Sequence, residues 1–356
     1  MKKMLSITLA MVMMLSVAGC GSSSSSSAEP AAEEASASAE VAVAEEAAPA
    51  VDPVVLKISI AETSTDIKAE VLADMIAEIE AETNGEIQFE VYYSNELGTL
   101  ADVTEQMAMG ANVLAGTSGD FYASYGSADI MASALQYALP TMEAVDKLSQ
   151  SDLFASWCDD IEAASGLKVL TCNWSAAPRS VLSTKEVSSV ADLQGLKVRV
   201  PGLAADAFFS ALGSSTMSMA FGDIYTNMQQ GMVEAAEAPL GTLYAYSLHE
   251  VAKYCYLSEH SLAPSCWAMS AAIFNSLSPE NQEILQSSLI KYGTIYGEKG
   301  LETEAEFRAE LEAAGVQFVE PSDEDKAIML QAGADSFDAF PEMTPGLADE
   351  IAKIIG

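Results

Sequence analysis

The chain has 356 residues, enough for one large domain or two ordinary domains with buried cores. It carries 52 acidic residues against 16 basic ones, and the formal net charge of −36 argues against nucleic acid or an anionic membrane surface as a partner held by charge. A small anionic ligand is compatible with this balance, because a few concentrated cations can oppose the net charge locally.

The first twenty residues have the pattern of a bacterial export signal. Lys2 and Lys3 precede an apolar run over 4–17, which is shorter than the ~20 residues that a membrane-spanning helix needs. The sequence LSVAGC at 15–20 is similar to a lipobox, so we expect cleavage before Cys20 and lipid attachment to its thiol. An ordinary secretory signal with a chance cysteine is the alternative. The prediction is an extracytoplasmic lipoprotein, anchored to the cell membrane, with residues 1–19 as its signal peptide.

Residues 20–53 have the composition of a linker. They contain a serine run followed by alanine, glutamate and proline, with seven acidic residues and no basic ones between Ala28 and Asp52. Such a segment has too little apolar surface to offset its ordering entropy. We predict a disordered acidic tether without a role in chemistry.

From residue 54 onward, apolar patterns alternate between strand and helix periods, which is typical of α/β folds. The first strands and helices are expected at 56–60, 67–79 and 87–93, followed by a short helix that runs to Gly110 and a strand over 112–116. Because ligands bind at the carboxyl ends of strands in such sheets, Glu62, Ser118 and Asp120 are candidate contacts. For each of them, an ordinary capping or turn role is the simpler alternative.

Two further helices, over 142–148 and 153–164, lead to a strand over 167–173 that is expected to cross into a second domain. Trp174 follows this strand directly, so it can line a ligand cleft or pack on the hinge, and the sequence leaves both open.

The stretch 190–240 has the predicted order strand–helix–strand–helix–strand, which is typical of a domain with a parallel sheet. Its first strand holds Arg199 among apolar neighbours. The chain has three arginines, Arg179, Arg199 and Arg308, against thirteen lysines. The planar fork of arginine binds a carboxylate through two parallel hydrogen bonds. Arg179 and Arg199 are therefore candidate carboxylate ligands, and a structural ion pair is the alternative for each.

The motifs of this stretch resemble those of TRAP-transporter solute-binding proteins, the DctP-like family. The resemblance rests on DLQGLKVRVP at 192–201, Leu212-Gly213, Phe221, Tyr225 and QGMVEAAEA at 230–238, which occur in order at matching spacing. It extends from about Val54 to the C-terminus.

The resemblance implies an α/β fold of the periplasmic-binding-protein type (type II, Venus-flytrap), with crossing strands and a long helix that links two domains. Domain I would comprise 54–176 plus 265–304, and domain II 177–264 plus 305–356. The linking helix would be the unbroken periodic pattern that begins at Ser278-Pro279.

The family also implies roles for individual residues. Arg199 would bind the ligand carboxylate in bidentate fashion, Arg179 matches a second family arginine, and Phe221 matches an aromatic that packs on the ligand. Glu237-Ala238 stands where many members have Glu-Asn, so one polar contact is lost or supplied elsewhere. With Trp174, these residues favour a small, partly apolar acid, such as a 2-oxo or aromatic monocarboxylate.

No pattern for enzymatic chemistry accompanies these motifs. The sequence has no HExxH, no GxSxG and no Gly-rich phosphate loop. The spacing of Cys158, Cys172, Cys255 and Cys266 fits no metal motif, and both disulfides and free buried thiols remain open. We expect no cofactor, no metal and no catalysis.

The family resemblance thus predicts a TRAP solute-binding subunit that captures a small carboxylate by domain closure and delivers it to integral-membrane subunits. We expect a monomer. The alternatives are an ABC-type binding lipoprotein or a ligand-sensing lipoprotein of the same fold.

Overall fold

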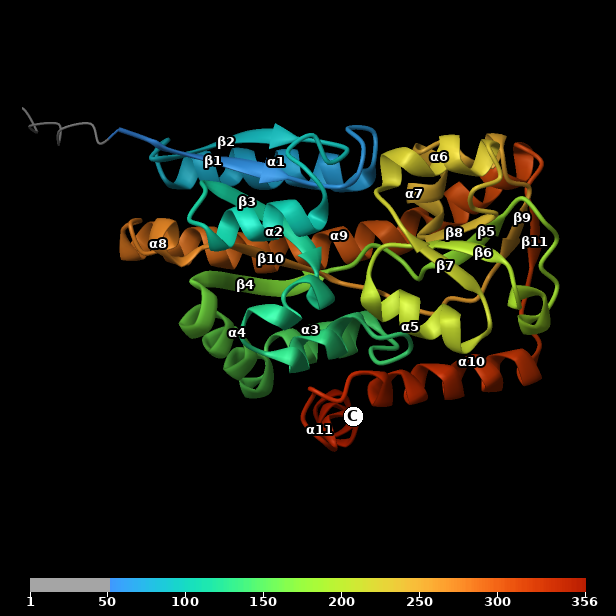
Figure 1. Cartoon of the computed structure of the whole chain (residues 1–356). Helices are drawn as coiled ribbons and strands as arrows, with labels where there is room; N and C mark the ends of the chain where they lie inside the picture. The colour runs from blue at the N-terminus through green and yellow to red at the C-terminus, as the bar shows by residue number, and fades with distance from the viewer. Residues whose placement is uncertain (1–51) are drawn as a thin grey trace, which may run out of the picture. The chain divides into compact units, whose positions relative to one another are not determined.

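The computed structural model describes residues 52–356, which fold around two β-sheets (Figure 1). The predicted signal peptide, Cys20 and nearly all of the predicted linker lie outside the described residues. None of the helices within 52–356 combines the length and the apolar character that a membrane span requires.

The first sheet has the strand order β2-β1-β3-β10-β4. The alternating apolar residues of the early sequence form its parallel part, and β10 returns antiparallel between β3 and β4. The sheet is therefore mixed. Its strands are β1 (Val54–Ser59), β2 (Ile87–Tyr92), β3 (Val113–Ser118), β4 (Leu167–Trp174) and β10 (Ser265–Ser270).

The second sheet has the order β11-β9-β5-β8-β6-β7. As predicted for the stretch 190–240, β6 pairs in parallel with both β7 and β8. Strand β5 lies antiparallel to β8 and β9. The strands are β5 (Ser180–Ser183), β6 (Lys197–Val200), β7 (Ser215–Ser218), β8 (Ala235–Ala238), β9 (Tyr254–Tyr256) and β11 (Gln317–Val319).

The predicted long helix is α9 (Pro279–Ala313), which has 35 residues. Ser278 caps it by accepting a hydrogen bond from the Asn281 N–H, and proline occupies the first turn, where its missing N–H costs nothing. The helix contacts β4 of the first sheet and also α7 (Leu240–Ala245), which follows β8 of the second sheet. Gly300 permits this packing, because a Cβ there would lie 2.0 Å from the carbonyl oxygen of Ala176.

The remaining helices pack around the two sheets. The predicted bounds of one of these helices are wrong. The sequence of 243–254 predicts a segment that is mostly helical, but α7 begins at Leu240, directly after Pro239, and ends at Ala245. Ser247 adopts a positive φ of 55°, which a continuing helix does not allow. The other helices are α1 (Ile67–Glu82), α2 (Leu100–Ala108), α3 (Met142–Ser149), α4 (Asp152–Ser165), α5 (Leu203–Ala211), α6 (Phe221–Gln229), α8 (Ala271–Phe274), α10 (Asp323–Asp335) and α11 (Leu347–Ile355).

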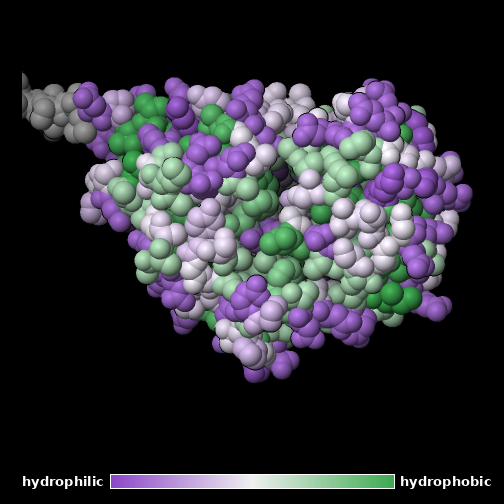
Figure 2. Space-filling model, viewed as in Figure 1, coloured by the Kyte–Doolittle hydropathy of each residue, from purple (hydrophilic) through white to green (hydrophobic). Residues whose placement is uncertain are grey.

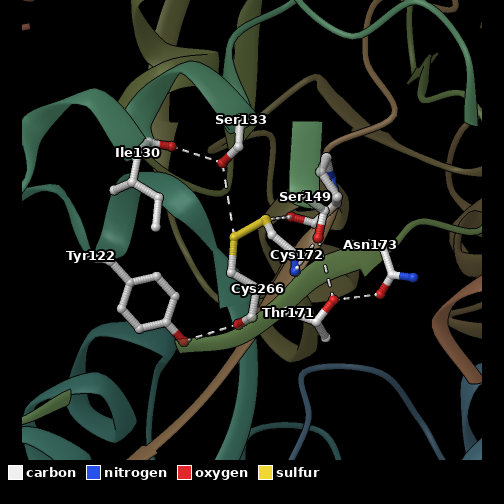
Figure 3. The surroundings of a disulfide bond; sticks show 9 residues. Tyr122, Ile130, Ser133, Ser149, Thr171, Cys172, Asn173 and Cys266 are labelled. Carbon is white, nitrogen blue, oxygen red and sulfur yellow. Dashed lines mark hydrogen bonds between the residues drawn. A yellow bond between two sulfur atoms is a disulfide. The ribbon is translucent and has the colours of Figure 1, made fainter. Parts of the chain in front are cut away.

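A disulfide joins Cys172 of β4 to Cys266 of β10, which settles the pairing that the sequence left open (Figure 3). The hydroxyl of Tyr122 donates to the carbonyl of Cys266 at 3.0 Å beside the bond. Cys158, which is half-buried, and Cys255, which is buried, have no disulfide partner among residues 52–356. The disulfide connects the strand that leaves the first sheet toward β5 with the strand that returns from β9.

Candidate functional site

A cavity of about 200 Å³ lies between residues that follow strands of the first sheet and residues at the ends of β6 and β7. Its walls include Ala61 and Asn95 on one side and Arg199, Met219 and Phe221 on the other. Figure 2 shows a recess between the parts that carry α2 and α6 in Figure 1, and the lining of the cavity includes Leu100 and Phe221, the first residues of these two helices. Strand ends of an α/β sheet are the expected place for a ligand.

Arg199 is the third residue of β6, and its side chain is buried in the wall of this cavity. The Nε–H donates to the carbonyl of Met219 at 2.8 Å, and the guanidinium carbon lies 4.2 Å from the ring centroid of Phe221. Nη1 is buried without a hydrogen-bond partner within residues 52–356. Burial lowers the pKa of Arg199 to about 10, so the side chain is still a cation at neutral pH.

Phe221 begins α6 and stacks on Tyr246, with ring centroids 5.2 Å apart and planes at 18°. The hydroxyl of Tyr246 donates to the carbonyl of Ala61, so it joins the residues after β1 to the end of α7. Tyr246 is not among the site residues predicted from the sequence. Its only signal in the sequence is an aromatic side chain within the segment 243–254 that was predicted to be helical, and its role depends on a contact with a residue far along the chain.

Arg179 is held by a carboxylate of the protein itself. Its Nε and Nη2 donate to the two carboxylate oxygens of Glu237 at 2.5 and 2.8 Å, and Nη2 also donates to the Glu237 carbonyl. His260 Nε2 lies 3.2 Å from the same carboxylate. Burial opposes ionisation of Glu237, but Arg179 and then His260 outweigh it and hold its pKa at about 2. His260, whose pKa burial lowers, was also missed.

A second, smaller cavity of about 40 Å³ shares Phe221 with the first and is also lined by Glu62, Lys68, Trp174 and Arg179. Glu62 follows β1 and forms an ion pair with Lys68, whose side chain is 3% exposed. The predicted pocket is therefore more polar than its apolar residues suggested. The indole N–H of Trp174 donates to the carbonyl of Leu289 at 2.7 Å.

The other predicted residues lie around these two cavities. Asp120 lines an adjoining cavity of about 430 Å³, where its carboxylate accepts from the N–H of Ala204 in α5 at 3.4 Å. Burial raises the pKa of Asp120. Ala238 is fully buried in β8, and Ser118, at the end of β3, lines none of these three cavities. A cavity of about 520 Å³ between α3 and α9 contains none of the predicted residues.

Within residues 52–356, no group of three or more histidine, cysteine or acidic side chains is placed to hold a metal ion. The described site therefore contains the buried Arg199 guanidinium, which has no ion-pair partner, and the stacked rings of Phe221 and Tyr246. It also contains two ion pairs within the protein, Arg179–Glu237 and Lys68–Glu62. These groups can bind and orient an anion.

Comparisons with known proteins agree with this geometry. Residues 58–342 match the family described as bacterial extracellular solute-binding protein, family 7. The 2,3-diketo-L-gulonate-binding periplasmic protein of Escherichia coli is 29% identical over 201 residues, which are 55% of this chain and 61% of that protein.

Two solved structures are similar over most of the chain. A TRAP periplasmic solute-binding protein of Fusobacterium nucleatum, with bound sn-glycerol-3-phosphate, has a TM-score of 0.79 and 25% identity, covering 85% of this chain and 96% of that one. A TRAP protein of Roseobacter denitrificans, with bound 3-deoxy-D-manno-oct-2-ulosonic acid, has a TM-score of 0.77 and 26% identity, covering 85% and 100%. These relatives are solute-binding proteins of transport systems rather than enzymes. The chain belongs to family 7 of the bacterial extracellular solute-binding proteins, the DctP family of TRAP transporters.

Proposed function

We propose that this protein is the solute-binding subunit of a TRAP transporter and captures a small organic acid through the carboxylate of that acid. The observation that carries the proposal is the buried guanidinium of Arg199, which has no carboxylate of its own in the described residues. A buried charge is costly unless it is paired, and a guanidinium matches a carboxylate in shape and charge. The acids named for the Escherichia coli and Roseobacter relatives support this ligand class.

Domain closure is the proposed mechanism, with the bodies bounded at 54–176 plus 265–304 and 177–264 plus 305–356. Contacts between the two sides support it: Thr242 donates to Asp66 at 3.1 Å, and Tyr246 donates to Ala61. A ligand held between Arg199 and the opposite wall would add to these contacts and so favour the closed form, which the membrane subunits would then recognise.

Calorimetry on the exported protein, purified in detergent, tests the proposal. The panel holds 2,3-diketo-L-gulonate, 3-deoxy-D-manno-oct-2-ulosonic acid, sn-glycerol-3-phosphate, aldonates and short 2-oxo acids. Arg199→Ala should weaken binding of the best ligand at least a hundredfold, because a charge-assisted, paired contact is worth a few kcal/mol. Arg308→Ala is the matched control, since Arg308 forms exposed pairs with Glu312 and Glu320. Equal affinity in wild type and Arg199→Ala would make Arg199 structural and contradict the proposed site.

We also propose that Cys20 carries the lipid anchor and that the protein works as a monomer. The lipobox-like sequence at 15–20 supports the anchor. Mass spectrometry of the N-terminal peptide and membrane fractionation of Cys20→Ala test it, and light scattering tests the monomer. An unmodified Cys20 in the exported protein would contradict the anchor without affecting the binding site.

A further inference from the structure

Three buried or nearly buried cations line the two cavities that share Phe221, and they differ in the carboxylate that balances each charge. Arg179 is neutralised by Glu237 through two side-chain hydrogen bonds. Lys68 is neutralised by Glu62. Arg199 has no carboxylate within ion-pair distance among the described residues. Of these three cations, only the Arg199 guanidinium therefore offers a ligand a positive charge that no ion pair balances.

The Lys68–Glu62 pair lines the smaller cavity, which we call the Glu62 end of the site, whereas Arg199 lines the larger cavity. The ammonium of Lys68 also lies 3.5 Å from the hydroxyl of Ser265 and 5.4 Å from the ring centroid of Tyr296. One carboxylate oxygen of Glu62 receives Lys68, and the other has no hydrogen-bond partner among residues 52–356. That free oxygen can accept a hydrogen bond from a ligand hydroxyl, whereas a carboxylate placed there would face a like charge.

A further acidic group lies close to this end. Asp66 caps α1 and accepts from Thr242, and its charge acts on Glu62, since Glu62 helps to raise the pKa of Asp66. At neutral pH the surroundings of Glu62 are thus more negative than the Lys68 pair alone suggests. A second ligand carboxylate would lose its water there without gaining a free cation.

We propose that the site is selective for a monoanion: an acid with one carboxylate on Arg199 and a hydrogen-bond donor directed toward Glu62, in preference to the diacid of the same length. This inference rests on the proposed function and specifies its ligand class. Selectivity comes from the repulsion of the second carboxylate as much as from the attraction of the hydroxyl.

Matched acids that differ only at the far carbon test the inference. Galactonate ends in CH2OH where galactarate ends in a second carboxylate, and 4-hydroxybutyrate and succinate form a shorter pair of the same kind. Calorimetry on the exported protein, purified in detergent, at pH 7.5, where all four acids are ionised, should give at least a hundredfold tighter binding of the monoanion in the pair that binds.

The variant Glu62→Gln sharpens the test, because it removes one negative charge and frees the Lys68 ammonium from its ion pair. The preference for the monoanion should fall at least tenfold, with the diacid gaining affinity. Glu143→Gln is the matched control: it breaks the exposed Glu143–Lys147 pair, and neither residue lines the two cavities. Its preference should equal that of the wild type.

The outcomes separate the two claims. Binding of the diacid as tight as that of the monoanion, with loss of both in Arg199→Ala, overturns the inference and leaves the proposed function intact. An unchanged preference in Glu62→Gln also overturns it. If no acid of either pair or of the wider panel binds, the proposed carboxylate function is contradicted and the inference with it.

Discussion

Removal of the disulfide between β4 and β10 should destabilise the protein strongly. Cys172 and Cys266 are separated by 94 residues along the chain, so the bond closes a long loop in the unfolded state. The chain-entropy relation gives about 16 cal/mol/K for a loop of this length, which is about 4.7 kcal/mol at 25 °C. We expect the double variant Cys172→Ala/Cys266→Ala to lose about 3 to 5 kcal/mol of unfolding free energy.

Urea unfolding followed by tryptophan fluorescence measures this loss, since Trp174 and Trp267 pack together beside the bond with ring centroids 5.0 Å apart. Cys158→Ala is the control, because it removes a free, half-buried thiol, and we expect a change within about 1 kcal/mol. Reduced wild type should unfold like the double variant. Denatured, unreduced protein should show two free thiols within residues 52–356 and four after reduction. Four thiols before reduction, or a loss below about 1 kcal/mol, would refute the reasoning.

Two further predictions concern Asp66 and the glycines of the helices. Burial, followed by the charge of Glu62, raises the pKa of Asp66 from 3.8 to about 6. The folded state therefore holds this proton more tightly than the unfolded state does. The contribution of Asp66 to the free energy of unfolding consequently falls by about 3 kcal/mol as the pH rises from about 4 to 6. Asp66→Asn should therefore be more stable than wild type at pH 7.5 and equal to it near pH 4, and urea unfolding at both values checks this; a constant difference would contradict the assignment. Gly300→Ala should lower the unfolding free energy by about 1–3 kcal/mol, because its Cβ meets the Ala176 carbonyl, whereas Gly222→Ala, which has open space, should be neutral or stabilising by up to about 1 kcal/mol. Equal thermal-shift results for the two alanine variants would argue against the close packing of α9.

Much of the fold could be predicted because its signals are local. The helix α9 follows from a serine cap, a proline in the first turn and an apolar period that no proline interrupts. Arg199 stood out because arginine is rare in this chain and because the surrounding motif is specific.

The rest of the site depends on contacts between distant residues, which a single sequence does not record. Lys68 lies in the first turn of a helix, where lysine is normally a solvated surface residue, and only the fold buries it beside Glu62. His260 and Tyr246 likewise acquire their roles from partners 23 and 185 residues away. The Cys172–Cys266 pairing also needs the arrangement of strands in the sheet.

The burial of Arg199 without an ion-pair partner among residues 52–356 has a consequence for the ligand-free protein. Burial lowers its pKa from 12.5 to about 10, which corresponds to about 3 kcal/mol against the charged form in this arrangement. An empty molecule that adopts the same arrangement holds this buried charge without a carboxylate partner among residues 52–356, which is unfavourable relative to an arrangement in which the guanidinium is hydrated. A bound carboxylate offsets the penalty. In the proposed transporter subunit, the arginine that binds the ligand would also disfavour this arrangement in the ligand-free protein. The membrane subunits would then seldom encounter a ligand-free molecule in the form that they recognise, and few transport cycles would run without a ligand.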